Sequence, residues 1–232
     1  DLHATCFLLE CLFLVCGLTL LYLTGITDDL IGVRYRQKFV IQILCACFFS
    51  IAELWINDLY GLLGIYAIPN WIGIPFTILT IVFITNAINL IDGIDGLASG
   101  LSSVALLVFG LLFIEKGLWM YSMLAFSTLG VLVPFFYYNV FGNAERARKI
   151  FMGDTGSLTL GYILSFLAIK YSQNNPEVIS NTKGTFLIAF STLIIPAFDV
   201  IRVVMVRLRN GKSPFEPDKN HIHHKFLAMG FT

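Results

Sequence analysis

Four short polar motifs interrupt the long apolar runs of this chain, and their residue types suit the binding of phosphate and a hard cation. In chain order they are TDDLIG at 27–32, NAINLIDGIDG at 86–96, FMGDTGS at 151–157 and SPFEPDKNHIHH at 213–224. Carboxylate and amide oxygens are ligands that Mg²⁺ accepts, and glycine allows the backbone to approach phosphate closely. Together the motifs favour metal-dependent phosphoryl transfer, in which charge neutralisation and positioning do most of the catalysis.

The carboxylates of the first and third motifs stand at the ends of apolar runs. Asp28 and Asp29 are adjacent. Because neighbouring residues on a helix project about 100° apart, we expect these two to have different roles. Asp154 lies between Gly153 and Gly156, where a carboxylate can hold a cation while free N–H groups face phosphate oxygens. Taken alone, Asp28 and Asp29 are equally well explained as solvated carboxylates at the point where a span leaves the membrane, and Asp154 as part of a capping turn. The functional interpretation therefore depends on the combination of the motifs.

The second motif places polar side chains at every third residue: Asn86, Asn89, Asp92 and Asp95. On an α-helix, each of these side chains is rotated by about 60° around the helix axis from the one before it. The four side chains therefore converge only if the helix breaks. The glycine that follows each aspartate permits such a break. The alternative is a capped turn in which one aspartate is the N-cap of the next helix, which leaves the asparagines unexplained.

The fourth motif carries three histidines, His221, His223 and His224, behind two prolines. Three histidines within four residues, without a nearby cysteine, are not a usual zinc spacing. With the lysines and arginines around them, they are better suited to donate hydrogen bonds to an anionic, phosphate-bearing substrate.

The composition predicts an integral membrane protein. Hydrophobic residues make up 57% of the chain and charged residues 13%, and the formal net charge of 0 gives no field that would attract nucleic acid. Apolar runs near the ~20 residues that cross a bilayer predict about seven spans. They are 4–26, 37–55, 71–90, 97–115, 118–139, 155–171 and 184–206. We expect an all-α, polytopic transmembrane helix bundle that forms one domain over residues 1–232, trimmed at both ends.

The basic residues predict the orientation of this bundle. Of the 15 lysines and arginines, all but Lys116, Lys170 and Lys183 fall on one side of the predicted spans. Cytoplasmic loops carry an excess of such residues, so this side should be cytoplasmic. The four polar motifs fall on the same side, which predicts an active site on the cytoplasmic face.

In this order and on these spans, the four motifs resemble those of the polyprenyl-phosphate N-acetylhexosamine-1-phosphate transferases, glycosyltransferase family 4. The resemblance covers essentially the whole chain, and the histidine motif is similar to that of the bacterial branch that loads GlcNAc-1-phosphate onto undecaprenyl phosphate. It implies attack by the lipid phosphate on the sugar-linked phosphorus of a UDP-N-acetylhexosamine, with release of UMP. It further implies a multi-pass protein of the bacterial cytoplasmic (inner) membrane that uses Mg²⁺, or Mn²⁺ in its place. Whether the protein forms a homodimer stays open.

The resemblance also implies roles for the acidic and amide residues. Asp28 would receive or orient the lipid phosphate, with Asp29 beside it. Asp92 is similar to a carboxylate that is implicated in activity through a disputed role. Asn89 and Asp154 match Mg²⁺ ligands.

The remaining matched residues would contact the UDP-sugar. Lys38 matches a lysine that meets the diphosphate, and Asp95 matches a position that contacts uracil. The histidines His221, His223 and His224 match a motif near the diphosphate and the sugar.

Several alternatives stay open from the sequence. Within the family, the substrate could be phospho-MurNAc-pentapeptide or another UDP-N-acetylhexosamine. A membrane diphosphatase would use water in place of the lipid phosphate, and a transporter or lipid-binding scaffold would do no chemistry. The identity of the base and the choice between direct attack and a covalent intermediate are also open.

Overall fold

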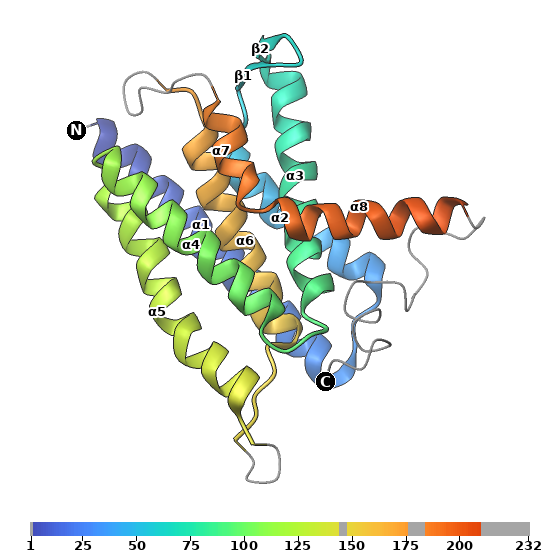
Figure 1. Cartoon of the computed structure of the whole chain (residues 1–232). Helices are drawn as coiled ribbons and strands as arrows, with labels where there is room; N and C mark the ends of the chain where they lie inside the picture. The colour runs from blue at the N-terminus through green and yellow to red at the C-terminus, as the bar shows by residue number, and fades with distance from the viewer. Residues whose placement is uncertain (1, 144–147, 176–183, 210–232) are drawn as a thin grey trace.

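The computed structural model describes residues 2–143, 148–175 and 184–209, and these form a bundle of helices with one short hairpin (Figure 1). The helices are α1 (Leu2–Ile31), α2 (Tyr35–Ile51), α3 (Asn70–Ile91), α4 (Leu97–Glu115), α5 (Trp119–Phe141), α6 (Gly153–Ser172), α7 (Thr185–Ser191) and α8 (Ile194–Arg209). The strands β1 (Asp58–Leu62) and β2 (Ile65–Ala67) pair in antiparallel fashion between α2 and α3.

The helices confirm the predicted all-α membrane protein. Each of the seven predicted apolar runs corresponds to a helical segment, the last of them to α7 and α8 together. Within the described ranges, α1, α3, α4 and α5 are long and apolar enough to span a bilayer, and a fifth span results if α7 and α8 are counted as one. The chain is therefore a multi-pass membrane protein, while the number of seven spans stays a prediction.

Two local features differ from the sequence expectation. The hairpin at residues 58–67 has strands of five and three residues, and Gly61 in β1 and Gly64 in the turn have φ of 84° and 78°. Strands this short give too little alternation to be predicted. The expected span at 184–206 is not straight, because α7 and α8 meet at an angle of 71°. Pro196 lies in the first turn of α8, where its missing N–H costs no helical hydrogen bond.

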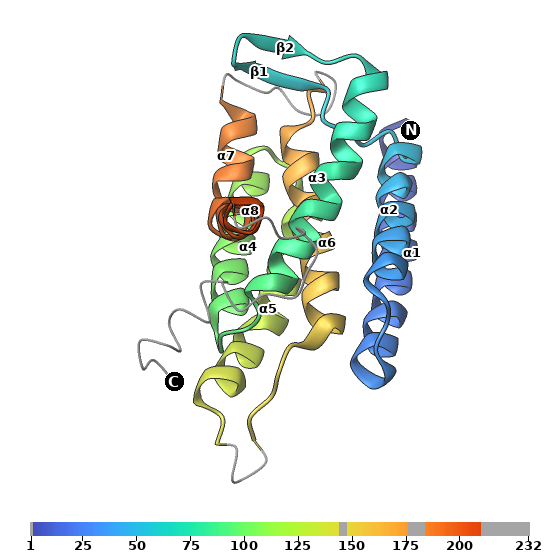
Figure 2. The same ribbon diagram turned by 90° about the vertical axis from the view of Figure 1, so that its right-hand side faces the viewer.

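Helix α6 is the central element of the bundle, with α1, α3 and α4 packed around it (Figure 2). Its side chains are buried over nearly its whole length. Glycine allows the closest approaches: a Cβ at Gly161 would lie 2.7 Å from the Thr85 Cα of α3, and a Cβ at Gly25 of α1 would overlap the backbone of Thr155. Small residues at such crossings let membrane helices approach backbone to backbone.

A buried ion pair joins α1 and α6 near the end of the bundle that carries the hairpin. Lys170 Nζ lies 2.6 Å from Glu10 Oε1, and the hydroxyl of Tyr121 in α5 donates to Glu10 Oε2 at 2.6 Å. Charges inside a membrane protein are costly unless they are paired in this way. The pair and the crossing at Gly25 together fix the position of α1 along α6.

Candidate active site

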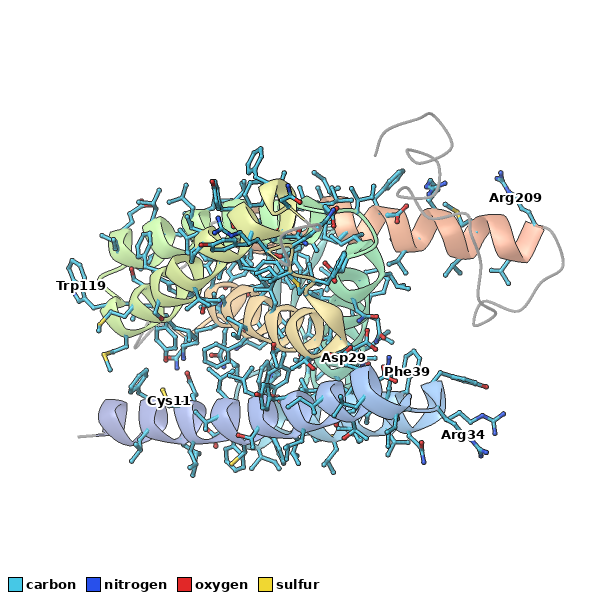
Figure 3. The ribbon with its side chains drawn as sticks, turned by 90° about the horizontal axis from the view of Figure 1, so that it is seen from below. Cys11, Asp29, Arg34, Phe39, Trp119 and Arg209 are labelled. Atoms are coloured by element: carbon cyan, nitrogen blue, oxygen red, sulfur yellow. The ribbon has the colours of Figure 1, made fainter. Side chains whose placement is uncertain are left out.

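Three of the four polar motifs meet at one end of the bundle, the lower end in Figure 1. The C-terminal end of α1, the N-terminal ends of α2 and α6 and the turn between α3 and α4 all lie there, and Figure 3 views this end from below. The fourth motif, with His221, His223 and His224, lies outside the described residues.

A lysine shared by two carboxylates forms the centre of this site. Lys38 Nζ, from the first turn of α2, makes an ion pair with Asp28 of α1 and a second with Asp154 of α6. Asp28 also accepts a hydrogen bond of 2.5 Å from the backbone N–H of Val33. These three charged side chains are largely shielded from solvent, with exposed fractions of 11% to 26%. Residues 116 positions apart in sequence are thus held together, as the resemblance implies for a common site.

Asn89 completes this cluster from α3. Its Nδ2 donates to Asp154 Oδ1 at 2.6 Å and to Ser157 Oγ at 2.8 Å, and Ser157 in turn donates to the Gly153 carbonyl at 2.8 Å. The two residues expected to bind metal are therefore direct neighbours. Rotation of the Asn89 side-chain amide by half a turn would direct its oxygen, in place of its nitrogen, toward a cation bound at Asp154.

Asp29 contacts a different set of groups, as adjacent positions on a helix predict. Its Oδ1 accepts the backbone N–H of Asp154 at 2.8 Å, and its Oδ2 accepts the backbone N–H and the hydroxyl of Thr155 at 3.1 and 2.6 Å. Asp29 is thus a tertiary N-cap for α6, and its charge is favourable at the positive end of the helix dipole. Gly153 has φ of 63°, and a Cβ there would lie 2.8 Å from Asp29 Oδ2.

The turn between α3 and α4 is held by Asn139 and Lys149, two residues that the sequence did not predict to belong to the site. Gly96, with φ of 79°, donates its N–H to Asn139 Oδ1 at 2.6 Å, and Asn139 Nδ2 donates to the Ile150 carbonyl at 2.9 Å. Asp95 makes an ion pair of 2.5 Å with Lys149. The one sequence signal for this contact was the position of Asn139 near the end of an otherwise apolar helix.

Asn86 does not join the carboxylates, so the predicted convergence of all four polar residues is wrong for this one. Its Nδ2 donates to Gln42 Oε1 at 2.5 Å and to the Val82 carbonyl at 2.7 Å. Helix α3 continues without a break to Ile91, and the glycine-containing turn begins only after it. Asn86 therefore forms a partly buried amide pair with Gln42 of α2. Gln42, a polar residue in an apolar run, was the sequence signal for this pair.

Asp92 lies in the turn after α3, beside the cluster. Burial raises the pKa of its carboxyl to about 7, and the negative charges of Asp154, Asp95 and Asp29 add to this effect. A carboxyl with a pKa near neutrality can both accept and release a proton at physiological pH.

This raised pKa predicts that stability falls with rising pH. Between the ordinary value of 3.8 and about 7, the folded protein binds the Asp92 proton more tightly than the unfolded chain does, so stability present at low pH is lost as pH rises through this window. Because Asp92 is partly solvated, we expect a loss of only about 2–4 °C in the unfolding midpoint between pH 5 and pH 8 without divalent cations. Asp92→Asn should remove most of this loss, and an equal loss in both proteins would contradict the assignment.

The oxygen donors at this end of the bundle fit a cation whose coordination is completed by substrate oxygens and water. Within the described ranges, no group of three or more His, Cys, Asp or Glu side chains is placed to hold a metal. Mg²⁺, however, is commonly held by one or two carboxylates together with substrate phosphates and water. Asp154, with the amide of Asn89 beside it, has the donor types that such a site would need.

Comparison with known proteins identifies the family. Residues 11–172, which include α2 to α6 and most of α1, match the profile of "Glycosyl transferase family 4". The chain belongs to glycosyl transferase family 4. Three of the four polar motifs of this family 4 chain lie inside the matched range.

Two relatives illustrate the similarity of this family 4 chain to named bacterial proteins. The chain is 31% identical to an "Undecaprenyl-phosphate alpha-N-acetylglucosaminyl 1-phosphate transferase" of Yersinia pestis over 223 residues, which are 95% of the chain and 59% of the relative. It is 30% identical to a protein of the same name from Escherichia coli (strain K12), with the same coverage. The chain thus spans about 59% of the length of these relatives.

Proposed function

We propose that this chain is the catalytic part of an enzyme that transfers GlcNAc-1-phosphate from UDP-GlcNAc to undecaprenyl phosphate in a bacterial cytoplasmic membrane. The products are a lipid-linked diphosphate sugar and UMP. The names of the family 4 relatives support the substrates. The observation that carries the proposal is the cluster of Asp28, Lys38, Asn89 and Asp154 at one end of a membrane bundle. The excess of basic residues at this end supports a cytoplasmic orientation.

The charges of the cluster suit a reaction between two phosphates. Asp154 and Asn89 would hold Mg²⁺, which when bound neutralises charge on the diphosphate. Lys38 already bridges two carboxylates, and its ammonium group can donate to phosphate oxygens that enter between them. In the transfer, an oxygen of the acceptor phosphate forms a bond to the β-phosphorus of the UDP-sugar. The bond from that phosphorus to the bridging oxygen breaks, and the electron pair leaves with UMP.

The other acidic residues would support this chemistry in separate ways. Asp28 would orient the acceptor phosphate. Asp29 acts on Asp154 through the cap of α6, because it binds the N–H of Asp154 itself. Asp92, with its pKa near 7, would receive or return a proton. Asp95 would contact uracil after release from Lys149.

The histidines complete the proposed substrate site. His221, His223 and His224 would contact the diphosphate and the sugar, as the family resemblance implies. They lie outside the described residues, so their part in the proposal rests on the sequence motif alone.

The proposal is tested by release of UMP from UDP-GlcNAc by the protein in its complete natural sequence, in detergent or lipid. We expect release only when undecaprenyl phosphate and Mg²⁺ are both present. Release without the lipid would indicate a diphosphatase. Release from UDP-MurNAc-pentapeptide but not from UDP-GlcNAc would assign the other branch of the family, and no release from any UDP-sugar by folded protein would contradict the proposal.

A further inference from the structure

A further ion pair lies at the site end of the bundle, apart from the two that Lys38 makes. Lys149, in the segment between α5 and α6, lies 2.5 Å from the carboxylate of Asp95, in the turn between α3 and α4. Figure 1 shows this segment and this turn at the same end of the bundle. The side chains are 27% and 34% exposed, so a ligand can reach both. Because partly exposed ion pairs contribute little to stability, stabilisation of the fold is a weak reason for this one.

A buried amide holds the two partners beside each other. Asn139 Oδ1 accepts the N–H of Gly96, the residue after Asp95, at 2.6 Å. Asn139 Nδ2 donates to the carbonyl of Ile150, the residue after Lys149, at 2.9 Å. Asn139 itself is only 4% exposed. One side chain thus fixes the backbone next to both charged residues, and the ion pair is a preorganised arrangement.

The surroundings of Lys149 add a flat apolar surface. Its backbone is packed on the end of α5, where a Cβ at Gly142 would lie 2.7 Å from Lys149 Cα. Its ammonium lies 5.8 Å from the centre of the Phe151 ring, which is 74% exposed. An exposed aromatic ring is a surface on which a nucleobase can stack. A donor, an acceptor and an aromatic face are therefore close together.

The ion pair also lies near the groups that would hold the diphosphate. Burial raises the pKa of Asp92, and the negative charges of Asp154 and Asp95 add to this effect, so both carboxylates are within electrostatic reach of Asp92. A nucleotide whose diphosphate is bound at Asp154 can therefore extend its base toward Asp95 and Lys149.

The donor and the acceptor of the pair match one edge of uracil. Uracil presents an N3–H donor next to the carbonyl acceptor O4, and nucleobases are commonly recognised by hydrogen bonds to this edge. A carboxylate only accepts hydrogen bonds, and an ammonium group only donates them. Cytosine has an unprotonated N3 and an amino group at the same positions. The pair would therefore oppose acceptor to acceptor and donor to donor if cytosine were bound.

We propose that Lys149 determines specificity for uracil, with its ammonium donating to O4 while Asp95 accepts the N3–H. On binding, Asp95 exchanges the ammonium for the N3–H, and Lys149, held beside it through Asn139, turns to O4. The contact of Asp95 is the one that the family resemblance implies, and the role of Lys149 is added from the ion pair. This assignment rests on the proposed function, since it concerns the base of the UDP-sugar in that reaction.

Binding of UMP and CMP measures the preference for the base without any transfer. Labelled nucleotides are dialysed to equilibrium against the protein in its complete natural sequence, in lipid nanodiscs with Mg²⁺. We expect the wild-type protein to bind UMP about tenfold or more tightly than CMP. Lys149→Met should weaken UMP binding by about the same factor and leave CMP binding unchanged, because it removes the donor to O4. Lys149→Arg keeps a donor and should retain much of the preference.

Arg148→Met is the matched control. Arg148 is exposed and forms no ion pair with a carboxylate among the residues that the structure describes, so this variant should bind both nucleotides as the wild type does. Equal loss of UMP and CMP affinity in Lys149→Met would overturn the assignment, since the lysine would then contact a phosphate or hold the segment. An unchanged preference for UMP in this variant, or no preference in the wild type, would overturn it as well.

Turnover separates the base from the reacting phosphates. Lys149→Met should raise the KM for UDP-GlcNAc about tenfold and leave kcat and the KM for undecaprenyl phosphate near the wild-type values. A loss confined to kcat would place Lys149 at the reacting phosphates and overturn the assignment. The two failures remain distinguishable. A UMP preference that depends on Lys149, without transfer to any lipid, keeps the base recognition and loses the proposed function, whereas transfer with an unchanged preference does the reverse.

Discussion

Asp154→Asn is expected to lower Mg²⁺-dependent turnover by a factor of about 10³ or more, several kcal/mol of barrier, while the protein stays folded. Asp154 contacts three other members of the site: its carboxylate binds Lys38 and Asn89, and its backbone N–H donates to Asp29. An amide in its place keeps the shape of the side chain but provides only one weakly basic oxygen. The loss should appear in kcat, and in a need for more Mg²⁺.

The measurement is UMP release over a range of Mg²⁺ concentrations, with Asp58→Asn as the matched control. Asp58 undergoes the same chemical change in β1 at the opposite end of the bundle, where it contacts Tyr60 and Asn174. The control should keep the wild-type Mg²⁺ dependence. Near-normal turnover of Asp154→Asn at saturating Mg²⁺ would remove this residue from the metal site.

Gly25→Val is expected to abolish activity through the packing of α1 on α6. A Cβ at Gly25 would overlap the Cα of Thr155, which is backbone and cannot rotate away. Overpacking typically costs about 1–3 kcal/mol, and an obstacle made of backbone should place the cost at the upper end or above it. Movement of α1 away from α6 would also break the cap by Asp29 and separate Asp28 from Asp154.

The thermal unfolding midpoint and UMP release report this effect, with Gly130→Val in α5 as the control. A Cβ at Gly130 meets no atom within 4 Å, so the same substitution there adds a side chain to open space. We expect the control to unfold near the wild-type temperature and to retain activity. A Gly25→Val protein that is as stable and active as the control would contradict the close crossing of α1 and α6.

The helices were predictable from sequence because each apolar run is long and is separated from the next by segments that contain glycine or charged residues. The turn after Ile91, with Gly96 at positive φ, was also predictable from its glycines. The hairpin at 58–67 and the bend between α7 and α8 were not, since both are set by a few residues in segments without periodicity. Pro196 suits the first turn of α8 but does not by itself predict a bend.

Within the site, the grouping of Asp28, Lys38, Asn89 and Asp154 followed from the family motifs, and the structure places these residues in contact. The cap that Asp29 provides could not be predicted, because it depends on the register of α1 against α6. The same holds for Asn86, whose pairing with Gln42 depends on the rotation of two helices. Contacts of this kind are tertiary, and no local pattern encodes them.

Transfer of a sugar-linked phosphate to a lipid can be followed by the position of a phosphorus label. UDP-GlcNAc carrying ³²P in its β-phosphate is incubated with the protein, undecaprenyl phosphate and Mg²⁺, and the label is followed into the organic phase. We expect the β-label to enter the lipid product, whereas an α-label should remain in water-soluble UMP. Label recovered only as GlcNAc-1-phosphate or free phosphate would show that water is the acceptor and would contradict the proposed transfer.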